Sequence, residues 1–273
     1  MQPFIKWAGG KRQLLNEIEK RLPNEYNTYF EPFIGGGALL FDIEPKDAVI
    51  GDTNKVLIDS YNYIKNDINL LITLLDEFAL NHEKTEDKKE FYYENRKIFN
   101  LKIEEEEYDI FTSALFIYLN KTCFNGLYRV NSKGVFNVPF NNRKKLKLYD
   151  ELNIIEVSKY LTNVKILNSD FEETCKTAKE GDFIFFDSPY APIKQDSFES
   201  YTKEGFSYEE HKRLARLFKE MTEKGVYCML TNHNTILINE LYSNYNIDVV
   251  KVKRMINSDA NNRVGEEVII TNY

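Results

Sequence analysis

Four consecutive apolar residues, Phe183 to Phe186, most restrict what this chain can fold into. A run this short is typical of a strand buried on both faces of a parallel sheet, and such a sheet needs helices on each side. Similar runs, separated by helical patterns, predict its partners at residues 28–31, 48–50, 164–167 and 226–230, with a closing pair at 247–252 and 268–271. The sequence therefore predicts an α/β protein.

The pattern becomes helical after the second predicted strand. From Leu57 onward, apolar residues recur three or four positions apart, and this spacing continues to about Leu119. We therefore predict an inserted, mostly helical domain at residues 57–164. Residues 1–56 and 165–273 are expected to form the domain that contains the sheet.

The predicted insert contains a strongly basic segment. The whole chain has a net charge of -7, but residues 110–149 contain seven Lys and Arg side chains and no Asp or Glu. Within this segment, residues 128–130 and 135–138 flank the turn-forming residues 131–134, which predicts a β-hairpin. A segment with charge of one sign indicates a polyanionic partner.

Several classes of protein are disfavoured by the sequence. No stretch approaches the roughly 18 apolar residues of a membrane span, and the N-terminus lacks a signal pattern, so we expect a cytoplasmic protein with no membrane partner. The three cysteines are widely spaced and form no C-x-x-C pair, which predicts reduced thiols in the core. The three histidines are scattered, and we expect no metal.

A glycine-rich turn follows the first predicted strand. Residues Pro32–Gly37 lead directly into the apolar residues Ala38–Phe41, as in a strand, a tight turn and a helix. Leu40 stands where a dinucleotide site has its third small residue, and Arg12 stands where a phosphate-binding loop has Ser or Thr after Lys11. The turn therefore indicates either a different nucleoside ligand or an ordinary crossover between strand and helix.

Ligands of open α/β sheets bind beyond the carboxyl ends of the strands, where several side chains are expected. Asp52 could accept hydrogen bonds from both hydroxyls of a ribose, or it could cap the next helix. Phe171, beside Asp170, could stack on an adenine or belong to the core. Trp7 and Lys11 flank two glycines at a helix N-terminus that suits a carboxylate, although a lone Trp usually packs in the core.

The sharpest signal is the sequence Asp187-Ser188-Pro189-Tyr190, directly after the apolar strand. The nitrogen of an aromatic amine is a weak nucleophile, because its lone pair is delocalised into the ring. Asp187 and the carbonyl of Ser188 could accept its two N–H bonds and let the nitrogen become more tetrahedral. Pro189 would fix the turn, and Tyr190 would stack on the ring. A methyl group on a sulfonium could then be transferred in line.

Five motifs follow one another along the chain, at residues 4–11, 30–37, 51–54, the hairpin 125–131 with 136–139, and 187–190. Together they resemble the Dam-type DNA adenine methyltransferases of the alpha group, as in the DpnII system, over nearly the whole chain. The resemblance implies a Rossmann-like sheet that uses S-adenosylmethionine, with an inserted DNA-recognition domain. It also implies an enzyme that flips adenine out of double-stranded DNA and methylates its exocyclic N6.

The resemblance implies roles for individual residues. The catalytic residues would be Asp187, Ser188, Pro189 and Tyr190. The residues that contact the cofactor would be Trp7, Lys11, Phe33, Gly35, Asp52, Asp170, Phe171 and Asp187. The recognition hairpin would supply Asn125, Leu127, Arg129 and Pro139. Arg129 would bind a guanine, which implies the target GATC. Phe124 would fill space near the flipped base, and the remaining DNA contacts would be Arg143, Lys144 and Lys145.

Two departures from the family pattern leave alternatives open. Ser188 stands where relatives have Pro; it keeps the backbone carbonyl, so we expect activity to be retained. Residues 141–143 replace a Gly-Arg-Tyr run, which leaves the strictness of the GATC choice open. The alternatives are a catalytically silent, cofactor-gated DNA-binding module and a methyltransferase of RNA or of a protein amide. A cognate restriction endonuclease is a candidate partner.

Overall fold

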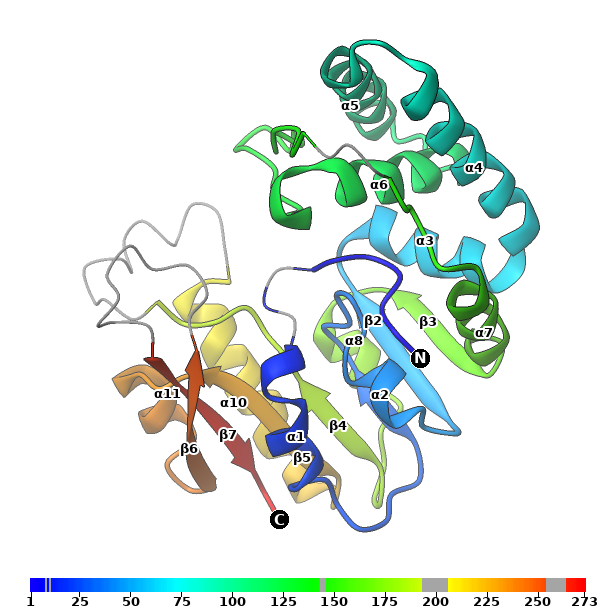
Figure 1. Cartoon of the computed structure of the whole chain (residues 1–273). Helices are drawn as coiled ribbons and strands as arrows, with labels where there is room; N and C mark the ends of the chain where they lie inside the picture. The colour runs from blue at the N-terminus through cyan, green and yellow to red at the C-terminus, as the bar shows by residue number, and fades with distance from the viewer. Residues whose placement is uncertain (8, 10, 143–145, 193–205, 254–263) are drawn as a thin grey trace. The chain divides into compact units, whose positions relative to one another are not determined.

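The computed structural model describes residues 1–7, 9, 11–142, 146–192, 206–253 and 264–273 (Figure 1). It contains a seven-stranded sheet with the order β3-β2-β1-β4-β5-β7-β6. The strands are β1 (Tyr29–Glu31), β2 (Ala48–Asp52), β3 (Val164–Asn168), β4 (Phe183–Phe186), β5 (Tyr227–His233), β6 (Asn246–Lys253) and β7 (Val264–Thr271).

The apolar strand β4 lies in the middle of this sheet. It pairs in parallel with β1 on one side and with β5 on the other, and all four of its residues are buried. The last two strands are antiparallel, β7 to β5 and β6 to β7. The α/β fold is therefore confirmed, including the closing antiparallel pair.

Helices flank the strands, and several of them follow one another between β2 and β3, as the helical spacing from Leu57 predicts. They are α1 (Leu15–Glu19), α2 (Leu40–Ile43), α3 (Lys55–Asn66), α4 (Ile68–Lys84), α5 (Lys88–Glu104), α6 (Ile110–Thr122), α7 (Glu151–Leu161), α8 (Phe171–Cys175), α10 (Tyr208–Glu223) and α11 (Ile236–Leu241), with short 3-10 turns η1 (Lys11–Gln13) and η2 (Phe124–Gly126). The apolar spacing of Leu14, Leu15, Ile18 and Leu22, with Pro23 as a stop, predicts a helix from about Lys11 to Leu22; the structure has η1 followed by a five-residue α1 instead. Ser207, three residues before Glu210, predicts a helix cap, and the structure confirms it: Ser207 Oγ accepts the Glu210 N–H at 3.2 Å at the start of α10.

The chain divides into two compact units. Unit 1 comprises Met1–Gly10, Gly35–Glu44 and Asp52–Asn168, and unit 2 comprises Lys11–Ile34, Pro45–Gly51 and Ser169–Tyr273. Unit 1 contains the whole of the predicted insert together with Gly35–Gly37, the second half of the glycine turn. The assignment of residues 57–164 to DNA recognition stays a prediction.

Unit 1 is organised around α6. Ten of the thirteen residues of this helix are buried, and α3, α4 and α5 all pack against it. Its side chains enter an aromatic core, in which Phe78 stacks on Tyr118 and Phe99 stacks on Phe116. A helix that is apolar on every side needs such cover, because it has no face suited to water.

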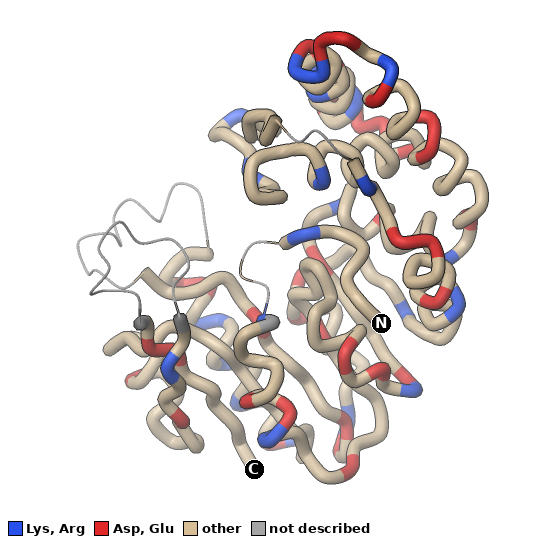
Figure 2. The backbone as a smooth tube through the Cα atoms, viewed as in Figure 1, with Lys and Arg blue, Asp and Glu red and all other residues tan. Residues whose placement is uncertain are grey.

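The predicted hairpin of unit 1 is less regular than a two-stranded ladder. Val130 and Phe136 form a single isolated bridge, and the tip closes through Asn131 N–H, which donates to Val135 O at 2.9 Å. Gly134 at the tip has φ +76°, which suits glycine. In Figure 2 the tube of this loop has blue positions and no red ones, as the sequence requires.

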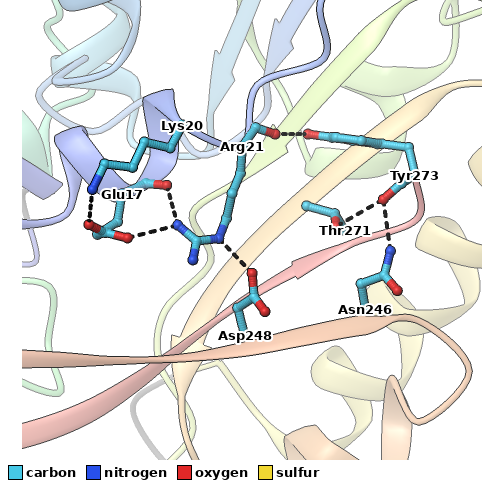
Figure 3. A network of polar contacts seen from close by, with 7 residues as sticks. All are labelled: Glu17, Lys20, Arg21, Asn246, Asp248, Thr271 and Tyr273. Carbon is cyan, nitrogen blue, oxygen red and sulfur yellow. Dashed lines mark hydrogen bonds and ion pairs between the residues drawn. The ribbon is translucent and has the colours of Figure 1, made fainter.

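In unit 2, a polar network holds α1 to the end of the sheet (Figure 3). Arg21 Nε donates to Asp248 Oδ2 in β6 at 2.6 Å, and a terminal nitrogen of Arg21 donates to Glu17 Oε2 at 2.9 Å. The hydroxyl of Tyr273, just after β7, donates to the Arg21 carbonyl at 2.7 Å. Because α1 follows η1 directly, this network also anchors the segment that begins at Lys11.

Two predictions from composition concern the core and the membrane. Cys123, Cys175 and Cys228 are all free and buried, so the prediction of reduced core thiols is confirmed. Burial raises the pKa of the Cys123 thiol to about 11, which keeps it protonated. Within the described ranges, no helix has both the length and the apolar character that crossing a membrane requires.

Candidate functional site

Asp187 follows the carboxyl end of β4 and lies beside two side chains of unit 2. Its Oδ1 is 2.5 Å from Lys11 Nζ and accepts a hydrogen bond from Thr231 Oγ1 at 2.9 Å. The register explains the second contact: Phe186 pairs with Leu230, so Asp187 and Thr231 follow on neighbouring strands. The structure therefore brings Lys11 and Asp187 together, as two of the predicted site residues, and adds Thr231, which the sequence did not indicate.

The electrostatics of Asp187 are a balance of opposing effects. Burial raises the pKa of its carboxyl group, while the Lys11 ammonium and the Thr231 hydroxyl lower it. Lys11 is only 6% exposed, so its charge acts through little intervening water. The net direction is a pKa above the ordinary value, with Lys11 as the chief group that favours the carboxylate.

Two neighbouring oxygen atoms, Asp187 Oδ2 and the carbonyl oxygen of Ser188, can each accept a further hydrogen bond. Lys11 and Thr231 both contact Oδ1 of the Asp187 carboxylate, and no group among the described residues contacts Oδ2. The carbonyl oxygen of Ser188 likewise accepts no recorded hydrogen bond from the part of the chain that the structure describes. A carboxylate oxygen and the next carbonyl can together accept the two N–H bonds of one amino group.

Asn232 in β5 holds the turn that contains these acceptors. Its Oδ1 accepts the N–H groups of Ala191 at 2.8 Å and His233 at 2.9 Å, and its Nδ2 donates to Ser188 Oγ at 3.4 Å. Asn232 is fully buried, and Ser188 is 2% exposed. The sequence analysis missed Asn232, although a polar residue next to a predicted buried strand was a signal for it.

Tyr190 is held at both ends of its side chain. Its hydroxyl donates to Glu267 Oε2 in β7 at 2.7 Å, and Lys11 Nζ lies 4.4 Å from the centroid of its ring. Burial, together with the charges of Asp187 and Glu267, raises the pKa of the Tyr190 hydroxyl, which therefore stays a donor. Glu267 was not predicted, because its place beside Tyr190 depends on how β7 pairs in the sheet.

In unit 1, Asp52 closes the glycine turn. Its Oδ2 accepts the Gly35 N–H at 3.2 Å, and its Oδ1 accepts the Asn54 N–H at 2.9 Å. The alternative that Asp52 caps the next helix is wrong, because the Asn54 side chain accepts the Leu57 N–H at 3.1 Å and caps α3. Burial raises the pKa of Asp52, and its two oxygens keep further lone pairs for other donors.

The glycine turn is shaped by Trp7. A Cβ atom on Gly35 would lie 2.6 Å from Trp7 Cδ1, and Gly35 has φ +46°. The indole also stacks on Tyr128, with centroids 5.6 Å apart and an interplanar angle of 13°. Glycine is therefore required at position 35 by the protein's own packing, and Trp7 links this turn to the start of the basic hairpin.

In unit 2, Phe171 lies in an aromatic cluster. Its ring stacks on Phe33 at 5.3 Å, and the Arg213 guanidinium lies 4.2 Å from its centroid. Asp170 caps α8 by accepting the Glu172 N–H at 2.9 Å, and it also pairs with Arg213. Phe171 is only 3% exposed, which supports the core alternative, whereas Phe33 is half-buried and keeps open surface.

The predicted DNA-reading residues are presented by the loop after α6. Phe124 is 52% exposed, Asn125, Arg129 and Pro139 are exposed, and Leu127 is half-buried. The loop turns sharply at Asn125, which has φ +56°. The three predicted residues Arg143, Lys144 and Lys145 lie outside the described residues.

Comparisons with known proteins agree with this arrangement. Residues 7–256 match the family described as D12 class N6 adenine-specific DNA methyltransferase. The chain is 44% identical to the type II methyltransferase M1.LlaDCHI of Lactococcus lactis subsp. cremoris, over 100% of this chain and 96% of that protein. It is equally similar, at 44%, to the type II methyltransferase M.MjaIII of Methanocaldococcus jannaschii, over 100% of this chain and 99% of that protein. It is 30% identical to the DNA adenine methylase of Escherichia coli K12, over 99% of this chain and 94% of that protein. The chain therefore belongs to the D12 class of N6 adenine-specific DNA methyltransferases.

Proposed function

We propose that this enzyme transfers a methyl group from S-adenosylmethionine to the exocyclic N6 of an adenine flipped out of double-stranded DNA, within GATC. The observation that carries the chemistry is the pair of neighbouring acceptors, Asp187 Oδ2 and Ser188 O, at the end of β4. Two acceptors match the two N–H bonds of an exocyclic amine. An alcohol or a thiol would use only one of them.

The protein's part in the reaction is to prepare the amine. Asp187 and Ser188 O hold the two N–H bonds, so that electron density returns from the ring to the nitrogen. The bound donor supplies an electrophilic methyl carbon on a sulfonium. After the methyl group has been transferred, one proton of the amine would leave to the solvent. Positioning supplies most of the acceleration. The Tyr190 ring is suited to stack on the base once Lys11 Nζ leaves its face.

Residues of each unit fit a methyl donor that carries adenosine. In unit 1, Asp52 keeps lone pairs for ribose hydroxyls, and Trp7 and Gly35 form the turn beside it. In unit 2, the partly open Phe33 ring suits an adenine, and Asp170 and Phe171 support that ring.

Other side chains of unit 2 also bear on how the donor would bind. The buried His211 Nε2 has no hydrogen-bond partner among the residues that the structure describes, and its ring lies 4.8 Å from Phe206 beside the Phe33 cluster. It is a buried polar atom beside the aromatic cluster that we propose supports the adenine. Lys11 and Asp187 are proposed to contact the donor's charged end.

The exposed loop residues fit the reading of DNA. Arg129 suits bidentate recognition of a guanine, and the exposed Phe124 ring suits the space that a flipped base leaves. Asn125, Leu127 and Pro139 lie on the same loop. We assign phosphate contacts to Arg143, Lys144 and Lys145 on the basis of charge alone.

Incubation with tritiated donor and synthetic duplexes tests this function. A duplex that contains GATC should gain label on adenine N6, and duplexes changed at single positions of GATC should gain much less. Label on single-stranded RNA or on a protein amide, with none on DNA, would contradict the proposal. Binding of the duplex without transfer of label would instead favour a catalytically silent DNA-binding module.

The cellular setting is also part of the proposal. Two relatives are named type II methyltransferases, which favours a cognate restriction endonuclease that cuts the same site. DNA as the substrate places the enzyme in the cytoplasm. Protection of a GATC-containing plasmid, in cells that express this chain, from a GATC-specific endonuclease that adenine methylation blocks would support methylation of GATC in the cell, and unprotected plasmid would contradict it.

A further inference from the structure

The loop that presents Arg129 has little backbone pairing of its own. Among the residues that the structure describes, its hairpin contains one isolated bridge, between Val130 and Phe136. The Asn137 N–H also donates to the Arg129 carbonyl, at 3.2 Å. A two-stranded hairpin is marginally stable even with full pairing. Other contacts must therefore hold the position of Arg129.

Side chains of α5 provide those contacts. Asn100 Oδ1 accepts the Phe136 N–H at 2.9 Å, and Asn100 Nδ2 donates to the Phe136 carbonyl at 3.1 Å. The Val138 carbonyl accepts from the Tyr92 hydroxyl at 2.8 Å and from a terminal nitrogen of Arg96 at 3.1 Å. These three helix residues are four positions apart and so share one face of α5. They bind residues 136–138 as a neighbouring strand would.

Asn137 lies between the two residues that α5 holds. Phe136 and Val138 are 3% and 1% exposed, whereas Asn137 is half-buried, as expected when successive side chains of an extended segment alternate. Asn137 Oδ1 accepts a hydrogen bond from Arg129 Nε at 2.8 Å. The terminal nitrogens of Arg129 have no recorded partner within the described ranges.

We propose that Asn137 is a positioning residue for sequence recognition: it fixes the plane of the Arg129 guanidinium so that the terminal nitrogens face a guanine. This inference rests on the proposed function. The guanidinium is planar, and binding of Nε sets the direction of the remaining donors. Bidentate contact with guanine O6 and N7 needs that direction to be defined. The contacts from α5 keep Asn137 from moving with the loop.

A double-mutant cycle tests the proposal. Wild type, Asn137→Ala, Arg129→Ala and the double variant are compared by kcat/KM on a GATC duplex and on duplexes in which one G·C pair is replaced. Asn137→Ala should lower the discrimination at the pair that Arg129 reads, by about tenfold. It should have no further effect in the Arg129→Ala background, because residues that act through one contact are not additive.

Two matched variants separate positioning from folding. Asn131→Ala removes an asparagine from the same hairpin that accepts the N–H groups of Lys133 and Val135 and does not touch Arg129, so discrimination at that pair should stay. Asn137→Asp keeps an acceptor for Arg129 Nε and should restore discrimination, while its charge weakens the binding of all duplexes alike. Thermal unfolding checks that each variant is folded.

The outcomes distinguish this inference from the proposed function. An equal effect of Asn137→Ala with and without Arg129 would mean that Asn137 acts independently of Arg129, and the inference would be wrong. Unchanged discrimination in Arg129→Ala would also overturn it, while methylation of adenine by wild type would still uphold the proposed function. A wild type that methylates no duplex would overturn both.

Discussion

Lys11 Nζ and Asp187 Oδ1 lie 2.5 Å apart, and the same ammonium is 4.4 Å from the centroid of the Tyr190 ring. Lys11 is 6% exposed and the Asp187 side chain 19%. The two groups that we propose for amine activation and base stacking therefore share one buried cation. Such a cation favours the ionised carboxylate, and a carboxylate is a stronger acceptor than a carboxylic acid.

Lys11→Met should move the pH dependence of methyl transfer. The ionised Asp187 is the stronger acceptor for the amine, and because burial raises its pKa in the folded enzyme, activity should fall as the pH drops through that raised value. Loss of Lys11 removes the main effect that lowers this pKa, so the acid limb should move to higher pH. Single-turnover rates at saturating donor, measured over a range of pH, give the position of this acid limb. The exposed Lys20 offers a control: Lys20→Met should leave the limb in place. An unmoved limb in Lys11→Met would show that this cation does not control Asp187.

Asp187→Asn should slow methyl transfer by about 100-fold or more, since loss of one oriented polar group at a reacting centre has effects of this size. The amide keeps an oxygen but loses the charge that draws density onto the amine. Single-turnover rates measure the effect, and duplex binding should be nearly unchanged. Asp42→Asn, at an exposed position, is the matched control. Wild-type rates in Asp187→Asn would contradict the assigned role.

Asn232→Leu should destabilise the fold. The substitution leaves the N–H groups of Ala191 and His233 without the Oδ1 that they bind, in a fully buried position. Buried donors without partners cost about 1–3 kcal/mol each, so the free energy of unfolding in urea should fall by about 2 kcal/mol or more. Asn163→Leu, at an exposed position, should change it little. A similar free energy of unfolding for both variants would show that the hydrogen bonds of Asn232 do not stabilise the fold.

Ser188→Pro should leave methyl transfer close to the wild-type rate. The chemistry uses the carbonyl oxygen of residue 188, which both residues have, and the Ser188 hydroxyl makes only a long contact of 3.4 Å with Asn232. The measurement is kcat with tritiated donor on one GATC duplex. The prediction that Ser188 supports activity would be wrong if the wild type were inactive and Ser188→Pro restored transfer.

The local pattern of the sequence was enough to predict many elements. The apolar run at β4, the helical spacing from Leu57 and the cap at Ser207 all depend on neighbours a few residues away, and the structure contains each of them. The motif Asp187–Tyr190 was predicted at a strand end for the same reason. The local pattern failed at 11–22, where the structure has a 3-10 turn followed by a short α1.

Only the tertiary structure decided what surrounds the motif. Thr231 and Asn232 contact it because β4 and β5 pair in one register, and Glu267 contacts it because β7 joins β5 antiparallel. A shift of one residue would turn these side chains to the other face of the sheet, and nothing within a single strand specifies the register. The sequence by itself predicted which residues would carry the chemistry, while pairing between distant strands determined their partners and orientation.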